Sequence, residues 1–128
     1  MIDHTGIVVS DFDRSKAFYR AALQPIGYEM LAEFPARITG RTDVAGFGEP
    51  PKADFWINRG TPNKPAVHVA FRVGSRTLVD AFYTAALAAG GTSNGAPGLR
   101  PHYHSDYYGA FVLDPDGHNI EVVCHQPG

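Results

Sequence analysis

The sequence predicts an α+β fold of two tandem βαβββ modules. Three observations predict it: an internal repeat, a strand followed by an amphipathic helix in each half, and three candidate strands after each helix. The chain is therefore expected to be a single domain, residues 1–128, made of two repeats of about 1–60 and 66–128.

The internal repeat appears when the sequence is shifted by 64 residues, which aligns the two halves without a gap over a 24-residue window. Nine positions of this window are identical, far more than unrelated segments would share, so we interpret the halves as duplicated modules. The first-half members of these pairs are His4, Val9, Ala17, Phe18, Tyr19, Ala21, Ala22, Leu23 and Gly27.

In the first module, alternating apolar residues predict a strand over 2–9, and apolar residues at helical spacing predict a helix over 14–23. Ser10, Asp11 and Asp13 are candidate caps for this helix. Further strands are expected at roughly 28–35, 43–47 and 53–58, with loops at 37–41, 46–52 and 60–64.

The second module repeats this order, with a strand expected over 66–73 and a helix over 78–89. Ser75 or Thr77 can cap the helix, and the glycines at 90 and 91 end it. Strands follow at 99–104, 108–113 and 119–125, the last two joined by an Asp-Pro-Asp-Gly turn.

Composition and charge exclude several classes of protein. Eleven Lys and Arg against 13 Asp and Glu give a net charge of -2, which disfavours nucleic-acid or anionic-membrane binding. No apolar run is long enough to span a membrane, and the amino terminus lacks the features of a secretory signal. Because Cys124 is the only cysteine and cannot form an internal disulfide, we expect a reducing, cytoplasmic setting.

A candidate metal site follows from strand alternation. His4 and His68, a repeat-related pair, are expected on the strand faces turned away from the helices, and Glu121 on the same face of the last strand. Two imidazoles and a carboxylate suit Fe, Mn, Ni or Zn and leave coordination positions open for substrate. Each residue taken singly is more often a hydrogen-bonded pocket histidine or a solvated glutamate.

The segment 99–108 is the richest polar stretch. If it forms a strand, Arg100, His102 and His104 point the same way, with Tyr108 beginning the next strand beside them. A histidine there could act as general acid or base, Arg100 could bind an anionic substrate, and Tyr108 could donate a hydrogen bond. The alternative is a solvated hairpin. Trp56, a candidate substrate-binding residue, either lines the concave surface or packs beneath it, whereas His118 and His125 are expected on the surface.

These motifs resemble the vicinal oxygen chelate superfamily, which contains glyoxalase I, extradiol dioxygenases, fosfomycin-resistance thiol transferases and bleomycin-resistance proteins. The resemblance covers nearly the whole chain, and its most specific parts are residues 3–11, 15–19, 67–71 and 114–121. It implies that the paired βαβββ modules form a cup-shaped mixed sheet around a metal, with the helices on the outer face of the sheet and with His4, His68 and Glu121 at three ligand positions. It also implies a homodimer, with the metal held by one subunit or by two.

The chain departs from the well-known members of this superfamily. Glyoxalase I has a fourth, carboxylate ligand on the last strand of its first module, but shifting Glu121 back by 64 gives Ile57, and Asp54 is the nearest carboxylate. A three-ligand set is similar to the dioxygenases and thiol transferases. Extradiol enzymes are usually about twice this length, and the tyrosine that they favour on the penultimate strand is replaced here by Phe111, a candidate substrate-binding residue.

Three functions are therefore weighed. The preferred one is a metal-dependent isomerase, lyase or dioxygenase that binds a small oxygenated substrate on an open His-His-Glu site. The second is a metal-free small-molecule or antibiotic-binding resistance protein of the same fold, favoured by the aromatic content of 34–48 and by Trp56. The third is a metal kept only for folding.

Overall fold

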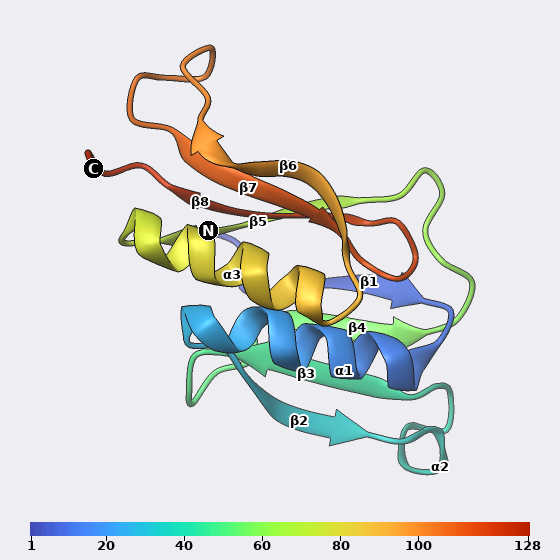
Figure 1. Cartoon of the computed structure of the whole chain (residues 1–128). Helices are drawn as coiled ribbons and strands as arrows, with labels where there is room; N and C mark the ends of the chain where they lie inside the picture. Colours follow the sequence, from blue (N-terminus) through green and yellow to red (C-terminus); the bar gives the residue numbers. More distant parts are fainter.

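The computed structural model describes all residues 1–128, and its elements follow the order βαβββ twice (Figure 1). The first module contains β1 (Thr5–Val9), α1 (Phe12–Leu23), β2 (Glu29–Phe34), β3 (Val44–Gly48) and β4 (Phe55–Arg59), with a 3-10 turn (Gln24–Ile26) after α1 and a one-turn helix α2 (Ala36–Thr39) after β2. The second module contains β5 (His68–Val73), α3 (Arg76–Ala88), β6 (Thr92–Leu99), β7 (Tyr108–Leu113) and β8 (Asn119–Cys124). The α+β fold of two repeated modules is confirmed.

Each module forms its own four-stranded mixed sheet, with the orders β1-β4-β3-β2 and β5-β8-β7-β6. In both sheets the first strand of the module pairs in parallel with the last, and the remaining pairs are antiparallel. The identical order in the two sheets agrees with the duplication that the sequence indicates.

The helices begin at capping residues. The Asp11 side chain accepts a hydrogen bond from the Arg14 N–H at the start of α1, and Ser75 accepts one from the Leu78 N–H at the start of α3. The two helices contact each other and cover one face of each sheet (Figure 1). No helix in the structure has the length and apolar character needed to cross a bilayer.

The core lies between the helices and the sheets. Alternate strand residues such as Ile7, Ile57 and Val122 are fully buried there against Phe18 and Phe82. All of them belong to one apolar cluster drawn from both modules. The other face of each sheet is consequently left free for polar residues, and we call it the open face.

Two sequence expectations are wrong in the second module. Residues 101–106 form turns rather than a strand, and β6 runs instead over Thr92–Leu99, where Gly95 and Gly98 mark shifts in its pairing with β7. Glycines and a proline gave this stretch the composition of a loop. His118 is fully buried rather than on the surface, because its ring is hydrogen bonded between the two modules.

Candidate functional site

The strand pairings determine which residues share an open face. On the second sheet, Ala70 and Phe111 both pair with Glu121, and His68 precedes Ala70 by two residues, so these four side chains lie on one face. Glu121 is only 2% exposed, although it lies on the open face. The structure therefore places a nearly buried carboxylate in the middle of a face that opens to solvent.

His68 and Glu121 are brought together. His68 Nε2 lies 2.8 Å from Glu121 Oε1, and the His68 side chain is about half exposed. Neighbouring ligands of one transition-metal ion, each bound at about 2.1 Å, are separated by roughly 3 Å. An imidazole nitrogen and a carboxylate oxygen at this separation fit two adjacent positions of such an ion.

The second carboxylate oxygen of Glu121 accepts a hydrogen bond from the Tyr107 hydroxyl. Burial and this contact with Glu121 raise the pKa of Tyr107, so the hydroxyl remains a protonated donor. Sequence reasoning missed Tyr107 and proposed the adjacent Tyr108, which lies on the helix side of the sheet and bonds to Asp80 at 2.7 Å. Tyr107 directly precedes β7, where strand alternation gives no direction for its side chain.

His4 lies outside this pair. It precedes β1, its side chain is exposed, and its Nδ1 lies 2.7 Å from Asp3 Oδ1. The hydrogen bond with His4, followed by the contact with Lys52, lowers the pKa of Asp3. Asp3 therefore keeps its charge and can hold one imidazole nitrogen while Nε2 remains free.

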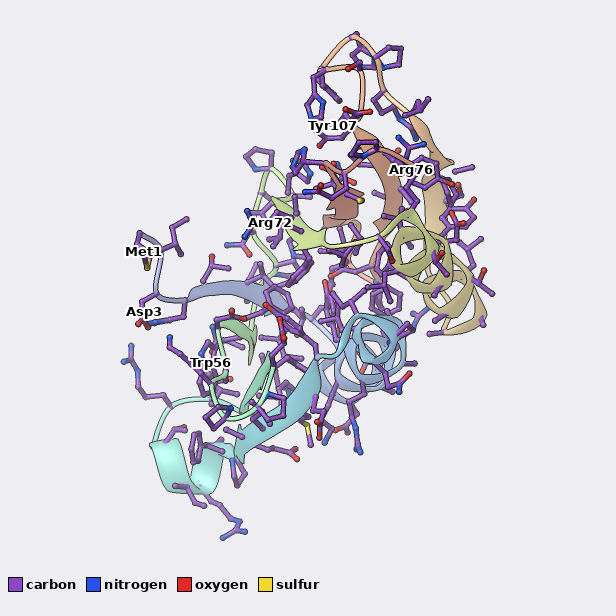
Figure 2. The ribbon with its side chains drawn as sticks, turned by 90° about the vertical axis from the view of Figure 1, so that its left-hand side faces the viewer. Met1, Asp3, Trp56, Arg72, Arg76 and Tyr107 are labelled. Atoms are coloured by element: carbon purple, nitrogen blue, oxygen red, sulfur yellow. The ribbon has the colours of Figure 1, made fainter.

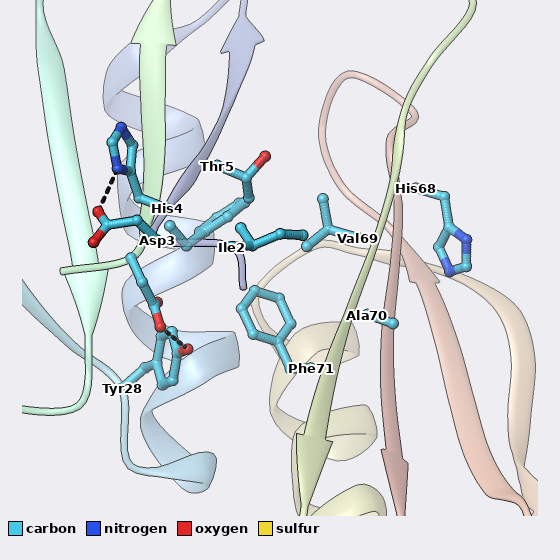
Figure 3. Close-up of a pocket in the computed structure, with 11 residues that line it drawn as sticks. Ile2, Asp3, His4, Thr5, Tyr28, His68, Val69, Ala70 and Phe71 are labelled. Atoms are coloured by element: carbon cyan, nitrogen blue, oxygen red, sulfur yellow. Dashed lines mark hydrogen bonds and ion pairs between the residues drawn. The ribbon is translucent and has the colours of Figure 1, made fainter.

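A hollow of about 410 Å³ separates the two histidines and lies between β1 and β5. Thr5, Tyr28 and Phe71 are among the residues that line it. Figure 3 shows the rings of His4 and His68 pointing away from each other on opposite sides of this hollow. No group of three or more His, Cys, Asp or Glu side chains within the chain is arranged to hold a metal ion.

The open face of the first sheet is aromatic where the second is acidic. Gly6 pairs with Trp56 as Ala70 pairs with Glu121, so Trp56 is the structural counterpart of Glu121. The counterpart inferred from the 64-residue shift, Ile57, is wrong by one residue, since Ile57 is buried on the helix side. The first sheet thus has no carboxylate at this position.

Two further features define this aromatic face. A methyl group at Gly46 would lie 2.7 Å from the Trp56 ring, so the indole lies directly across the glycine. The Phe34 ring is nearly parallel to it, with centroids 6.4 Å apart. Figure 2 shows Trp56 on the first module and Tyr107 on the second. Asp54 lies just before β4, where it accepts a hydrogen bond from the Tyr28 hydroxyl at 3.0 Å.

The remaining predicted site residues lie around the turn after β6. The Arg100 guanidinium lies 5.5 Å from the centre of the Phe111 ring on the open face. His102 is exposed and packs on Tyr103. His104 Nε2 lies 2.8 Å from His125 Nδ1, at the edge of the site beside Tyr107. Arg100 and Phe111 are thus near Glu121, whereas His102 belongs to the outer turn.

Comparisons with known proteins agree with this geometry. Residues 1–122 match the sequence profile of the Glyoxalase/Bleomycin resistance protein/Dioxygenase superfamily. The metallothiol transferase FosB of Shouchella clausii is 31% identical over 122 residues, which cover 94% of this chain and 77% of that protein.

Solved structures show the same fold. A glyoxalase/bleomycin resistance protein from Albidiferax ferrireducens has 28% identity and a TM-score of 0.76, covering 95% of this chain and 97% of that chain. The fosfomycin resistance protein FosX from Listeria monocytogenes, crystallised with Mn(II) and sulfate, has 16% identity and a TM-score of 0.70, covering 98% of this chain and 93% of that chain. Because FosX is only 16% identical, this similarity concerns the fold only.

Proposed function

We propose that this chain, which belongs to the Glyoxalase/Bleomycin resistance protein/Dioxygenase superfamily, is a divalent-metal-dependent enzyme acting on a small oxygenated substrate. The observation that carries the proposal is the 2.8 Å approach of His68 Nε2 to Glu121 Oε1 on the open face of the second sheet. The similarity to FosB, a metallothiol transferase, supports a metal ion, and FosX shows that this fold can hold Mn(II). The candidates are Fe, Mn, Ni and Zn.

The third ligand in this proposal is His4 of a second copy of the chain. His4 holds the repeat-equivalent position of His68 on the first module, yet its ring points away from its own His68. In a homodimer that faces the first sheet of one copy with the second sheet of the other, two such sites form by symmetry. Each copy then supplies one part of both sites.

The chain's own residues would bind and orient the substrate around this centre. The ion supplies Lewis-acid polarisation of a substrate oxygen when bound. Arg100 offers a positive charge to an anionic oxygen, and Phe111 and the partner's Trp56 form apolar walls. His104, which packs on Tyr107 at the edge of the site, would be the group that moves a proton there. Isomerase, lyase and dioxygenase chemistry fit such a site, and the similarity to FosB adds thiol transfer.

Elemental analysis tests the proposal. Wild-type protein, reconstituted near neutral pH and desalted, should hold about one metal ion per chain, and Glu121→Ala should lose it. Glu33→Ala is the matched control because Glu33 is an exposed glutamate paired with Lys16, far from the site in the fold. Equal metal content in all three proteins would contradict the proposed site.

A second candidate function is metal-free binding of a small molecule or antibiotic. The parallel rings of Phe34 and Trp56 on the open face of the first sheet favour it, because flat apolar ligands stack on such surfaces. Wild-type protein that takes up no divalent ion, together with quenching of Trp56 fluorescence by planar ligands, would support this function over the metal-dependent one.

A further inference from the structure

We propose that Tyr107 is a positioning residue that makes Glu121 a one-oxygen metal ligand and so keeps a coordination position open for substrate. This inference rests on the proposed function, because it concerns the same site. The observation behind it is that the two carboxylate oxygens of Glu121 have different partners. Oε1 faces His68 Nε2, and Oε2 accepts a hydrogen bond from the Tyr107 hydroxyl.

Glu121 has no freedom to turn within this arrangement. Its side chain is 2% exposed and lies between strands β5 and β7, where it pairs with Ala70 and Phe111. A carboxylate that rotated to present both oxygens to an ion would give up the Tyr107 bond in a nearly buried setting, which is unfavourable. Oε1 is therefore the oxygen available to a metal.

Gly109 provides the room that Tyr107 needs. A methyl group at position 109 would lie 3.3 Å from Tyr107 Cε1, slightly tighter than ordinary van der Waals contact, and 3.4 Å from Glu121 Oε2, in ordinary contact. The missing side chain lets the phenol cross the strand and reach the carboxylate. The Tyr107–Glu121 contact is thus built into the local sequence of β7.

The Tyr107 backbone and ring are also held in place from outside the site. Its carbonyl accepts from the Arg100 N–H at 2.7 Å, and its N–H donates to the His104 carbonyl at 3.2 Å. The rings of His104 and His125 meet the Tyr107 ring edge-on, with centroids 5.5 Å and 5.3 Å away. His104 and His125 also hydrogen bond to each other, so the two rings pack as a pair against the phenol.

The consequence concerns the number of open positions. If Glu121 supplies one oxygen and two histidines supply imidazole nitrogens, the protein would hold the ion by three atoms and leave its remaining coordination positions to substrate or water. A two-oxygen Glu121 would take one of these. Loss of the Tyr107 hydroxyl should therefore alter the coordination of the bound ion, and because it removes the hydrogen bond that orients the Glu121 ligand it should also weaken metal binding.

Tyr107→Phe tests this inference, with Tyr108→Phe as the matched control. Tyr108 is the next residue and also bonds to a carboxylate, Asp80, but on the helix side of the sheet. We expect Tyr107→Phe to weaken Mn(II) binding by roughly 10- to 100-fold, and Tyr108→Phe to leave it within about threefold. The dissociation constant is measured by Mn(II) titration, and the electron paramagnetic resonance spectrum of the bound ion should change only in Tyr107→Phe.

The outcomes separate this inference from the proposed function. If wild-type protein binds Mn(II) and Tyr107→Phe binds it with the same affinity and spectrum, the positioning role is overturned while the metal site stands. If Tyr107→Phe lowers the free energy of unfolding of the metal-free protein in urea but leaves the Mn(II) affinity and spectrum unchanged, the residue is structural and the inference is also overturned. Wild-type protein that binds none of Mn(II), Fe(II), Ni(II) and Zn(II) would overturn the proposed function, and this inference with it.

Discussion

The His118 ring joins the two modules by donating from Nε2 to the carbonyl oxygen of Val8, at 3.0 Å. Its Nδ1 accepts from the Val67 N–H at 3.1 Å, which fixes the proton of the neutral ring on Nε2. The ring is fully buried. A single side chain near the end of the chain thus bonds to β1 of the first module and to the residue that precedes β5.

His118→Ala should therefore destabilise the fold strongly. The change removes the His118 partner of the half-buried Val8 carbonyl and Val67 N–H and opens a cavity where the ring was, so we expect a loss of roughly 2–4 kcal/mol in the free energy of unfolding. Urea unfolding followed by circular dichroism measures it. His102→Ala, on the exposed turn, should change stability by less than about 0.5 kcal/mol. Similar stabilities for the two variants would show that His118 does not hold the modules together.

Stability should fall at alkaline pH because of Tyr19. Burial, followed by the contact with Asp114, raises the pKa of Tyr19 well above its ordinary value of 10.0. The folded state then keeps a proton that the unfolded chain releases, so the stabilisation is present below pH 10.0 and is lost as the pH rises towards the folded-state pKa.

Tyr19→Phe isolates this contribution. The variant lacks the bond to Asp114, so it should be less stable than wild type at neutral pH, and the difference should narrow as the pH rises above 10.0. Unfolding by urea at a series of pH values measures the difference. The free energy of unfolding of Tyr19→Phe should still fall with rising pH, because the pKa values of Tyr28 and Tyr107 are raised as well. A stability difference between wild type and Tyr19→Phe that stays constant as the pH rises above 10.0 would show that Tyr19 does not cause the alkaline loss of stability.

Gly46→Ala should displace the Trp56 ring. The added methyl group would lie 2.7 Å from the indole, so the ring must shift away from β3. Because Trp56 is the only tryptophan, the emission maximum and intensity of the protein report its position directly. Gly74→Ala is the control, since nothing lies within 4 Å of a methyl group there. Unchanged emission in Gly46→Ala would mean that the indole does not rest on this glycine.

The sequence was sufficient to predict the modules because their signals are local and repeated. The alternation in β1 and β5 and the helical spacing in α1 and α3 occur twice, 64 residues apart, and the capping residues precede both helices. β6 was misplaced because its glycines and proline carry turn signals, although pairing with β7 holds the segment extended.

Only part of the candidate site could be predicted from the sequence. Alternation placed His68 and Glu121 on one face, and the structure brings them together. It could not reveal Tyr107, which reaches Glu121 from a turn, nor the burial of His118, which depends on how the modules dock. The direct 64-residue shift also failed on the last strands, since the pairing makes Trp56 rather than Ile57 the counterpart of Glu121.

The proposed site between two copies is tested most directly by a heterodimer of two variants that each lack one proposed ligand. His4→Ala and Glu121→Ala, carrying different affinity tags, are coexpressed, and the species with both tags is purified and analysed for metal. If each site draws His4 from one copy and His68 with Glu121 from the other, this heterodimer contains one intact site and should bind about one ion, whereas either homodimer should bind none. A heterodimer as empty as its parent homodimers would contradict a metal site formed between two copies.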